Sequence, residues 1–122
     1  MAVIGIGVDL VDIARFERQI ERTPRLRGRL FTPEELEQRG RVLPPRSLAG
    51  RFAAKEALVK ALGDSYQFGW LDIPLFTDER GKPSFELRAG AAECAATLGV
   101  RDVHVSISHD AGTAIAFVVV EG

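Results

Sequence analysis

The sequence has few of the residues and segments on which several large protein classes depend. Its 122 residues include a single cysteine, Cys94. One cysteine cannot form a disulfide within the chain, so we expect a reducing cytoplasm rather than an oxidising compartment. No stretch approaches the ~20 consecutive apolar residues of a membrane-spanning helix, and the N-terminus carries no basic leader. The sequence therefore predicts a soluble, cytoplasmic protein with no membrane partner.

Two common ligand motifs are incomplete or missing. Gly5 and Gly7 form G-x-G, but the third glycine of the dinucleotide-binding fingerprint is absent, and no phosphate-binding G-x-x-x-x-G-K-[ST] occurs. Glycines inside a strand more often permit a neighbouring element to pack closely. Two histidines and one cysteine provide no cluster at zinc spacing. We therefore expect neither a Rossmann-type site nor a zinc site.

Length and composition are those of one ordinary globular domain. The chain is 46% hydrophobic and 27% charged, and 122 residues are too few for two typical domains. The net charge of −1 conceals an asymmetry, because residues 11–51 contain ten arginines against six acidic residues. Such an imbalance predicts a basic face for an acidic partner.

Apolar periodicity and turn residues predict helices and strands in mixed order, hence one α+β domain over residues 1–122. Residues 47–62 form the strongest predicted helix, which Gly63 would end. The other predictions are a mostly buried strand at 3–11, a helix from Asp12 to about Arg22, a short helix after the capping box at 32–35, strands at 70–77 and 84–88, a helix at 90–98, and a hairpin of strands 102–108 and 113–120.

Two acidic residues lie where apolar residues are expected. Asp9 lies inside an apolar strand, where an unpaired carboxylate is costly, although a capping or ion-pair role would explain it. Glu56 and Lys60 share one face of the predicted helix. They are either a surface i,i+4 pair worth ~0.5 kcal/mol, or they line a cleft, with Glu56 holding a cation and Lys60 meeting a phosphate. Two carboxylates suit magnesium better than zinc.

Histidine and arginine positions give weaker predictions. His109 ends a predicted strand and precedes a tight turn, where reactive side chains are often displayed, although a structural role is the simpler explanation of its position. Arginines recur at steps of three and four residues, which predicts a basic stripe on a helix. A solvated face is the simplest explanation, whereas arginine also favours contact with carboxylates or phosphates. The stripe comprises Arg15, Arg18, Arg22 and Arg25.

Four segments, in order, resemble the bacterial holo-acyl-carrier-protein synthases, the small type of phosphopantetheinyl transferase. They are GIGVDLVDIARF, RFAAKEALVKALG, GKP and SISHD. The resemblance implies an antiparallel sheet packed on a long central helix, and a homotrimer with active sites at subunit interfaces. It also implies transfer of 4′-phosphopantetheine from coenzyme A to a serine of apo-acyl carrier protein, with magnesium as cofactor and adenosine 3′,5′-bisphosphate as second product. The pathway would be fatty acid biosynthesis.

The resemblance further implies roles for individual residues. Asp9 and Glu56 would bind magnesium, and Lys60 would contact the diphosphate or assist the leaving group. The base that accepts the serine proton stays open among Glu56, a metal-bound water oriented by Asp9, and His109 with Asp110 as its orienter. Arg15, Arg18 and Arg22 would dock the acidic helix of the carrier protein. Coenzyme A would be held by Arg51, Phe52, Lys60, Gly81, Lys82, Pro83 and His109.

Two other functions are compatible with some of these features. In a nucleic-acid-binding module, the arginines would contact phosphates, while Asp9 and Glu56 would be structural. Phe16 is the only aromatic residue between the arginines of the stripe, and this scarcity is evidence against that module, so we expect no nucleic-acid partner. A hydrolase of phosphate anhydrides would use the same carboxylates, but it would cleave coenzyme A without a carrier protein.

Overall fold

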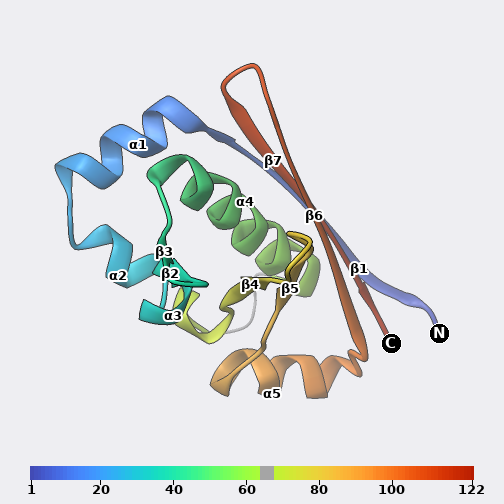
Figure 1. Cartoon of the computed structure of the whole chain (residues 1–122). Helices are drawn as coiled ribbons and strands as arrows, with labels where there is room; N and C mark the ends of the chain where they lie inside the picture. The colour runs from blue at the N-terminus through green and yellow to red at the C-terminus, as the bar shows by residue number, and fades with distance from the viewer. Residues whose placement is uncertain (64–67) are drawn as a thin grey trace.

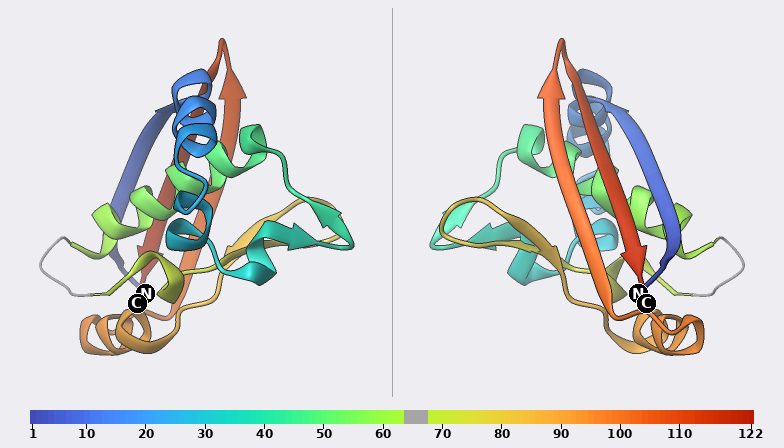
Figure 2. Two further views of the ribbon diagram at one scale, coloured as in Figure 1. Left: turned by 90° about the vertical axis from the view of Figure 1, so that its left-hand side faces the viewer. Right: turned by 90° about the vertical axis from the view of Figure 1, so that its right-hand side faces the viewer.

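The computed structural model describes residues 1–63 and 68–122 as a sheet covered on one face by helices (Figures 1 and 2). The first and last residues lie together, because the Ala2 amide donates to the Gly122 carbonyl at 2.8 Å. The elements are β1 (Val3–Asp12), α1 (Ile13–Arg22), α2 (Leu26–Leu30), α3 (Pro33–Leu36), β2 (Glu37–Gln38), β3 (Arg41–Val42), α4 (Pro45–Leu62), the 3-10 helix η1 (Trp70–Asp72), β4 (Leu75–Thr77), β5 (Pro83–Phe85), α5 (Ala89–Leu98), β6 (Asp102–Asp110) and β7 (Thr113–Glu121).

The main sheet is antiparallel, with the strand order β1-β7-β6. The β6–β7 hairpin turns at Ala111 and Gly112, both with positive φ, as a two-residue hairpin turn requires. The register aligns Asp9 with Ala116 and Ala116 with Ile107, so one row of side chains crosses all three strands. β2–β3 and β4–β5 form two small additional sheets. The predicted α+β class and hairpin are confirmed.

Helix α4 packs directly on the inner face of this sheet. A Cβ atom added to Gly7 would lie 1.8 Å from the Ala57 carbonyl oxygen, and one added to Gly5 would lie 1.8 Å from that of Ala61. The G-x-G pair therefore allows β1 and α4 to make backbone contact, which is the packing role expected for it. This close contact fixes the position of Asp9 relative to the last turns of α4.

The prediction that β1 is mostly buried is wrong for the single chain. Ile6, Val8 and Leu10 are 58%, 45% and 65% exposed, respectively. Alternate residues of a strand point to opposite faces, and α4 covers only one of them (Figure 2). Ile115 and Phe117 of β7 extend the exposed outer face. We call these five side chains the outer apolar face.

Several boundaries differ from those predicted. Helix α4 begins at Pro45 rather than Ser47, with proline in its first turn. The segment predicted as a strand from Trp70 to Thr77 starts as η1, and only Leu75–Thr77 is a strand. Helix α2 was not predicted, because it has only five residues and one of them is Gly28. No helix in residues 1–63 and 68–122 is long and apolar enough to cross a bilayer.

Candidate active site

Asp9, Lys60 and Glu56 come together where β1 crosses the end of α4. Lys60 Nζ donates to Asp9 Oδ1 at 2.9 Å and to the Val8 carbonyl oxygen at 3.2 Å. The Asp9 side chain is only 11% exposed, whereas that of Lys60 is 55% exposed. The acid in the apolar strand therefore has an ion-pair partner, and the lysine remains accessible to a ligand.

The carboxyl of Glu56 lies against that of Asp9. Burial raises the pKa of Glu56, the charge of Asp9 and a hydrogen bond with it raise this pKa further, and the charge of Lys60 lowers it. The hydrogen bond and the charge of Asp9 raise the pKa of Lys60. One lysine thus neutralises only part of the charge of two adjacent carboxylates. We call Asp9, Glu56 and Lys60 the carboxylate cluster.

This donor set fits a hard divalent cation. Magnesium is commonly held by one or two carboxylates, and water and phosphate oxygens complete its octahedron. A cation between Asp9 and Glu56 would remove the repulsion that raises the pKa of Glu56. Within residues 1–63 and 68–122, no group of three or more histidine, cysteine or acidic residues could form a closed protein site.

A second group of predicted residues lines one cavity of about 170 Å³ at the other edge of the sheet. The Arg51 side chain enters it from α4, and burial lowers the pKa of this guanidinium. The imidazole of His109 lies against Gly50, where an added Cβ would be 2.7 Å from His109 Nε2. We call this space the arginine–histidine cavity. Its lining is Ser47, Arg51, Thr77, Gly81, Pro83, Ile107 and His109.

The GKP segment contributes through its backbone turn. Asp78 accepts hydrogen bonds from the amides of Arg80 at 2.8 Å and Lys82 at 2.9 Å, which holds Gly81 at a φ of +81°. Gly81 and Pro83 line the arginine–histidine cavity, whereas the exposed Lys82 side chain is not part of its lining.

An adjoining basic cavity was missed in the sequence. This space of about 330 Å³ shares Ser47, Arg51 and Thr77 with the arginine–histidine cavity and adds Arg39 and Arg41. Arg39 donates from Nη2 to the Thr77 carbonyl oxygen at 2.6 Å. The only available signal was the R-G-R triplet at positions 39–41, which by itself predicts a turn.

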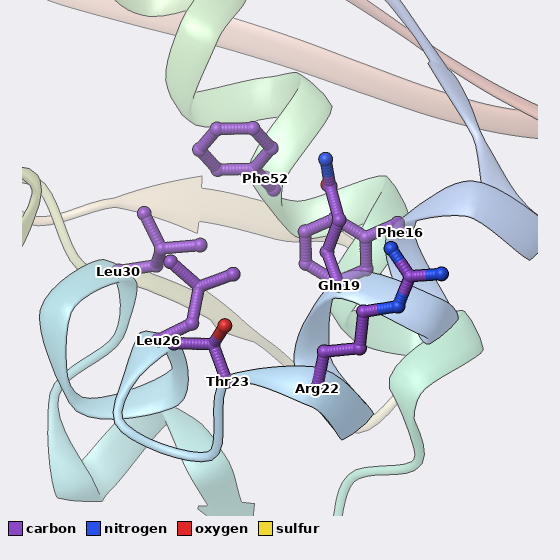
Figure 3. Close-up of a pocket in the computed structure, with 7 residues that line it drawn as sticks. All are labelled: Phe16, Gln19, Arg22, Thr23, Leu26, Leu30 and Phe52. Carbon is purple, nitrogen blue, oxygen red and sulfur yellow. The ribbon is translucent and has the colours of Figure 1, made fainter.

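Phe52 lies apart from the other predicted coenzyme A residues. Its ring stacks on Phe16, with centroids 5.7 Å apart, and meets Trp70 edge-on at 5.2 Å. It lines a third cavity, of about 440 Å³, between α1, α2 and α4 (Figure 3). We call it the helix cavity. Its lining is Phe16, Gln19, Arg22, Thr23, Leu26, Leu30 and Phe52.

The predicted docking arginines lie on the exposed face of α1. Asp12 caps this helix as predicted, since its Oδ1 accepts the Arg15 amide at 2.9 Å. Ile13, Phe16 and Ile20 bury the opposite face. Arg15, Arg18 and Arg22 are exposed, and Arg22 also lines the helix cavity.

His109 and Asp110 lie at the end of β6. His109 and Asp110 are consecutive in β6, so their side chains point to opposite faces. In the described part of the chain, no hydrogen bond joins these two side chains.

The most deeply buried charges, Lys55 and Glu35, were not predicted. Burial of Lys55 could have been inferred from the sequence, because Lys55 lies three residues before Leu58 on an apolar face of the predicted helix.

Helix α4 separates the carboxylate cluster from the arginine–histidine cavity. Arg51 and Glu56 are five residues apart, so their side chains diverge by roughly 140° around the helix axis. Asp9 is on β1, at one edge of the sheet, and His109 is on β6, at the other. Within one chain, the two groups therefore flank α4 on different sides.

Comparison with known proteins gives a consistent result. The model of the 4′-phosphopantetheinyl transferase superfamily matches residues 5–118. The holo-[acyl-carrier-protein] synthase of Clavibacter michiganensis is 57% identical, over 97% of this chain and 95% of that protein. The holo-[acyl-carrier-protein] synthase of Streptomyces coelicolor is 46% identical, over the full length of both chains.

Solved structures agree with the sequence matches. The holo-[acyl-carrier-protein] synthase of Neisseria meningitidis superimposes with a TM-score of 0.88 at 34% identity, covering 99% of this chain and 100% of that one. The Helicobacter pylori synthase, solved in complex with coenzyme A, superimposes with a TM-score of 0.79 at 34% identity, covering 95% of this chain and 99% of that one. The chain therefore belongs to the 4′-phosphopantetheinyl transferase superfamily and, within it, to the holo-[acyl-carrier-protein] synthases, a family of transferase enzymes.

Proposed function

We propose that this protein, as one domain over residues 1–122, transfers 4′-phosphopantetheine from coenzyme A to a serine of apo-acyl carrier protein with the help of magnesium. The serine oxygen forms a bond to the β-phosphorus of coenzyme A, and the bridging bond to the α-phosphate breaks. Holo-carrier protein and adenosine 3′,5′-bisphosphate are the products. The carboxylate cluster carries this proposal, because phosphoryl transfer depends chiefly on positioning and charge neutralisation.

Asp9 and Glu56 would hold the magnesium ion, which when bound would neutralise charge on the diphosphate. Lys60 lies beside them with its ammonium group accessible to a diphosphate oxygen. Its positive charge would stabilise the leaving bisphosphate as negative charge develops there.

Among the candidate bases, the geometry favours Glu56. Glu56 lies against Asp9 and near the charge of Lys60, in the carboxylate cluster where the diphosphate of coenzyme A would be held. The side chains of His109 and Asp110 point to opposite faces of β6, so His109 lacks the support expected from Asp110. We therefore propose Glu56 as the group that accepts the serine proton.

The nucleotide end of coenzyme A would occupy the two basic cavities. Its phosphates are anionic, and Arg51, His109, Arg39 and Arg41 line connected spaces that share Thr77. Arginine contacts phosphate oxygens through two parallel N–H groups. These cavities therefore support recognition of the nucleotide rather than the reaction step.

The exposed arginines of α1 would dock an acidic helix of the carrier protein. The helix cavity opens beside them and offers aromatic and aliphatic walls to an apolar side chain (Figure 3). Charge would accelerate the encounter, and the apolar contact would slow dissociation. Phe52, which the resemblance places among the residues that hold coenzyme A, would therefore also contribute to this docking surface.

Two observations support self-assembly. The outer apolar face leaves five apolar side chains of β1 and β7 exposed, as interaction surfaces do. In addition, the carboxylate cluster and the arginine–histidine cavity flank α4 on different sides, so one coenzyme A would reach both only between two copies. We propose a homotrimer, with the number of copies taken from the family resemblance, and a cytoplasmic location.

The deciding measurement is the intact mass of an apo-acyl carrier protein after incubation with this protein, coenzyme A and magnesium. A gain of one phosphopantetheinyl group, abolished by EDTA, is expected. An unmodified carrier with intact coenzyme A would contradict the proposal. An unmodified carrier with cleaved coenzyme A would identify a hydrolase instead.

A further inference from the structure

A fully buried ion pair is hydrogen-bonded to a residue that lines one cavity and is linked, through Leu75, to Arg51, which lines another. Lys55 and Glu35 are both fully buried, and Lys55 Nζ lies 2.8 Å from Glu35 Oε1. Nζ also donates to the carbonyl oxygens of Leu30, at 2.6 Å, and Trp70, at 3.0 Å. An ammonium group has three protons, so every donor of Lys55 has an acceptor. Two of the three bonds hold backbone of other elements against α4.

The contact with Leu30 determines where one wall of the helix cavity stands. Leu30 is the last residue of α2, so its carbonyl has no partner within that helix. Leu30 and Leu26, both on α2, line the helix cavity together with Phe52 of α4. Because Lys55 is also on α4, its bond to Leu30 sets the distance between the two walls.

Glu35 continues the hydrogen-bonded chain toward the arginine–histidine cavity. Its Oε1 accepts the Thr32 amide at 2.9 Å, and its Oε2 accepts the Leu75 amide at 3.0 Å. The Leu75 carbonyl oxygen in turn accepts from Arg51 Nη1 at 3.5 Å and from Gln38 Nε2 at 3.1 Å. Arg51 lines both basic cavities. Leu75 of β4 is thus held at its amide by Glu35 and at its carbonyl by Gln38 and, through a longer contact, by Arg51.

We propose that Lys55 and Glu35 are positioning residues that set the geometry of both substrate sites at once, the helix cavity through Leu30 and the arginine–histidine cavity through Leu75. This inference rests on the proposed function, in which the carrier protein uses the first cavity and coenzyme A the second. Neither residue touches a substrate.

A contribution to stability alone is a weak explanation for this pair. Replacing a buried ion pair by neutral groups of similar volume is often neutral or stabilising, because both charges lose their hydration in the folded state. Burial lowers the pKa of Lys55, whereas the charge of Glu35 and a hydrogen bond with it raise this pKa. In addition to the bond between its own side chains, the pair makes four hydrogen bonds to backbone groups, which apolar side chains cannot provide.

The test is the double variant E35Q/K55M, which removes both charges and roughly preserves volume. We expect it to fold with a lowered melting temperature, because two buried carbonyl oxygens lose the ammonium group that binds them. We expect KM to rise roughly tenfold for both coenzyme A and the carrier protein, since misplacing a positioned group by about 1 Å can cost up to a hundredfold. The change in kcat should be smaller than either change in KM.

A matched control is available on the surface. Glu34 precedes Glu35 in α3, and its Oε1 lies 3.1 Å from Arg88 Nη1 in an exposed pair. The double variant E34Q/R88M removes this pair by comparable changes, together with the contact of Arg88 with Glu86. Because neither residue contacts the proposed sites, we expect both KM values to remain at the wild-type level.

The outcomes separate the inference from the proposed function. Wild-type transfer activity in the same assay tests the function, and the ratio of variant to wild-type KM tests the inference. A folded E35Q/K55M variant with unchanged KM values, or with only one of the two raised, would overturn the joint positioning role. If the double variant does not fold, the single variant E35Q is measured at the same substrate concentrations, and wild-type KM values there would overturn it equally.

Discussion

Gly50 leaves the space that the imidazole of His109 occupies. A Cβ atom at position 50 would lie 2.7 Å from His109 Nε2 and 3.0 Å from Ile107 Cγ2. Atoms do not approach this closely without displacement, so the missing side chain of a residue on α4 determines where a side chain on β6 can lie. This contact brings His109 beside Arg51 in the arginine–histidine cavity.

Gly50→Ala should separate helix stability from coenzyme A binding. Alanine is favoured over glycine in a helix by about 1 kcal/mol, which would offset part of the crowding. The displaced imidazole should raise KM for coenzyme A severalfold, with little change in KM for the carrier protein. Steady-state kinetics and a thermal melt would measure both effects.

Two further variants control the Gly50 prediction. Gly28→Ala places a methyl group on a helical glycine with no atom within 4 Å, and it should leave KM unchanged. The double variant G50A/H109A should behave like H109A alone, because both changes act through the same imidazole. Additive effects would show that Gly50 acts by another route.

Glu56→Gln should abolish transfer without unfolding the protein. The pKa of Glu56 is raised in the folded state, so its charged form is disfavoured there and wild-type stability should fall as pH rises above the ordinary glutamate pKa. Glutamine carries no charge, so the variant does not lose stability in this way and should melt no lower than the wild type at neutral pH. The difference between the two melting temperatures should shrink as the pH is lowered. Transfer near the wild-type rate would remove Glu56 from the proposed site.

Magnesium should stabilise the wild-type protein in the absence of substrate. A ligand that binds only the folded state at a hundred times its Kd stabilises by about 2.7 kcal/mol. The melting temperature should therefore rise with added magnesium and fall back with EDTA. Asp9→Asn should reduce this response, and an equal response in the variant would place the metal elsewhere.

Charge reversal at Arg15 and Arg22 should weaken use of the carrier protein. Both side chains are exposed on α1, so R15E/R22E should raise KM for the carrier protein at low salt, with a smaller effect at high salt because screening weakens the attraction. KM for coenzyme A should not change. Arg101→Glu, also exposed but between α5 and β6, is the matched control.

Leu10→Lys should disrupt the proposed assembly. Leu10 is 65% exposed in the single chain and belongs to the outer apolar face. A buried, unpaired ammonium group at a subunit interface is strongly unfavourable. Light scattering after size exclusion should show a trimer for the wild type and smaller species for the variant. Leu71→Lys, 44% exposed outside this face, should leave the trimer intact, and a monomeric wild type would contradict the assembly.

Local features of the sequence were sufficient to predict much of the fold. The capping box at Thr32, the cap at Asp12 and the helix ending at Gly63 depend on bonds between residues a few positions apart. Asp9 and Glu56 could be selected as a pair because each is an acid in an apolar pattern, and the cost of burying an unpaired charge does not depend on the fold.

The tertiary structure decided which residues face each other. Phe52 stacks on Phe16 and Lys55 pairs with Glu35, and each contact joins segments that are distant in the sequence. Arg51 and Glu56 likewise lie on different sides of α4, where they meet residues of different strands. Exposure of the outer apolar face likewise depends on which element covers each side of β1. Hydrophobic periodicity determines that a strand has an apolar face, but only the arrangement of the whole chain determines what covers it.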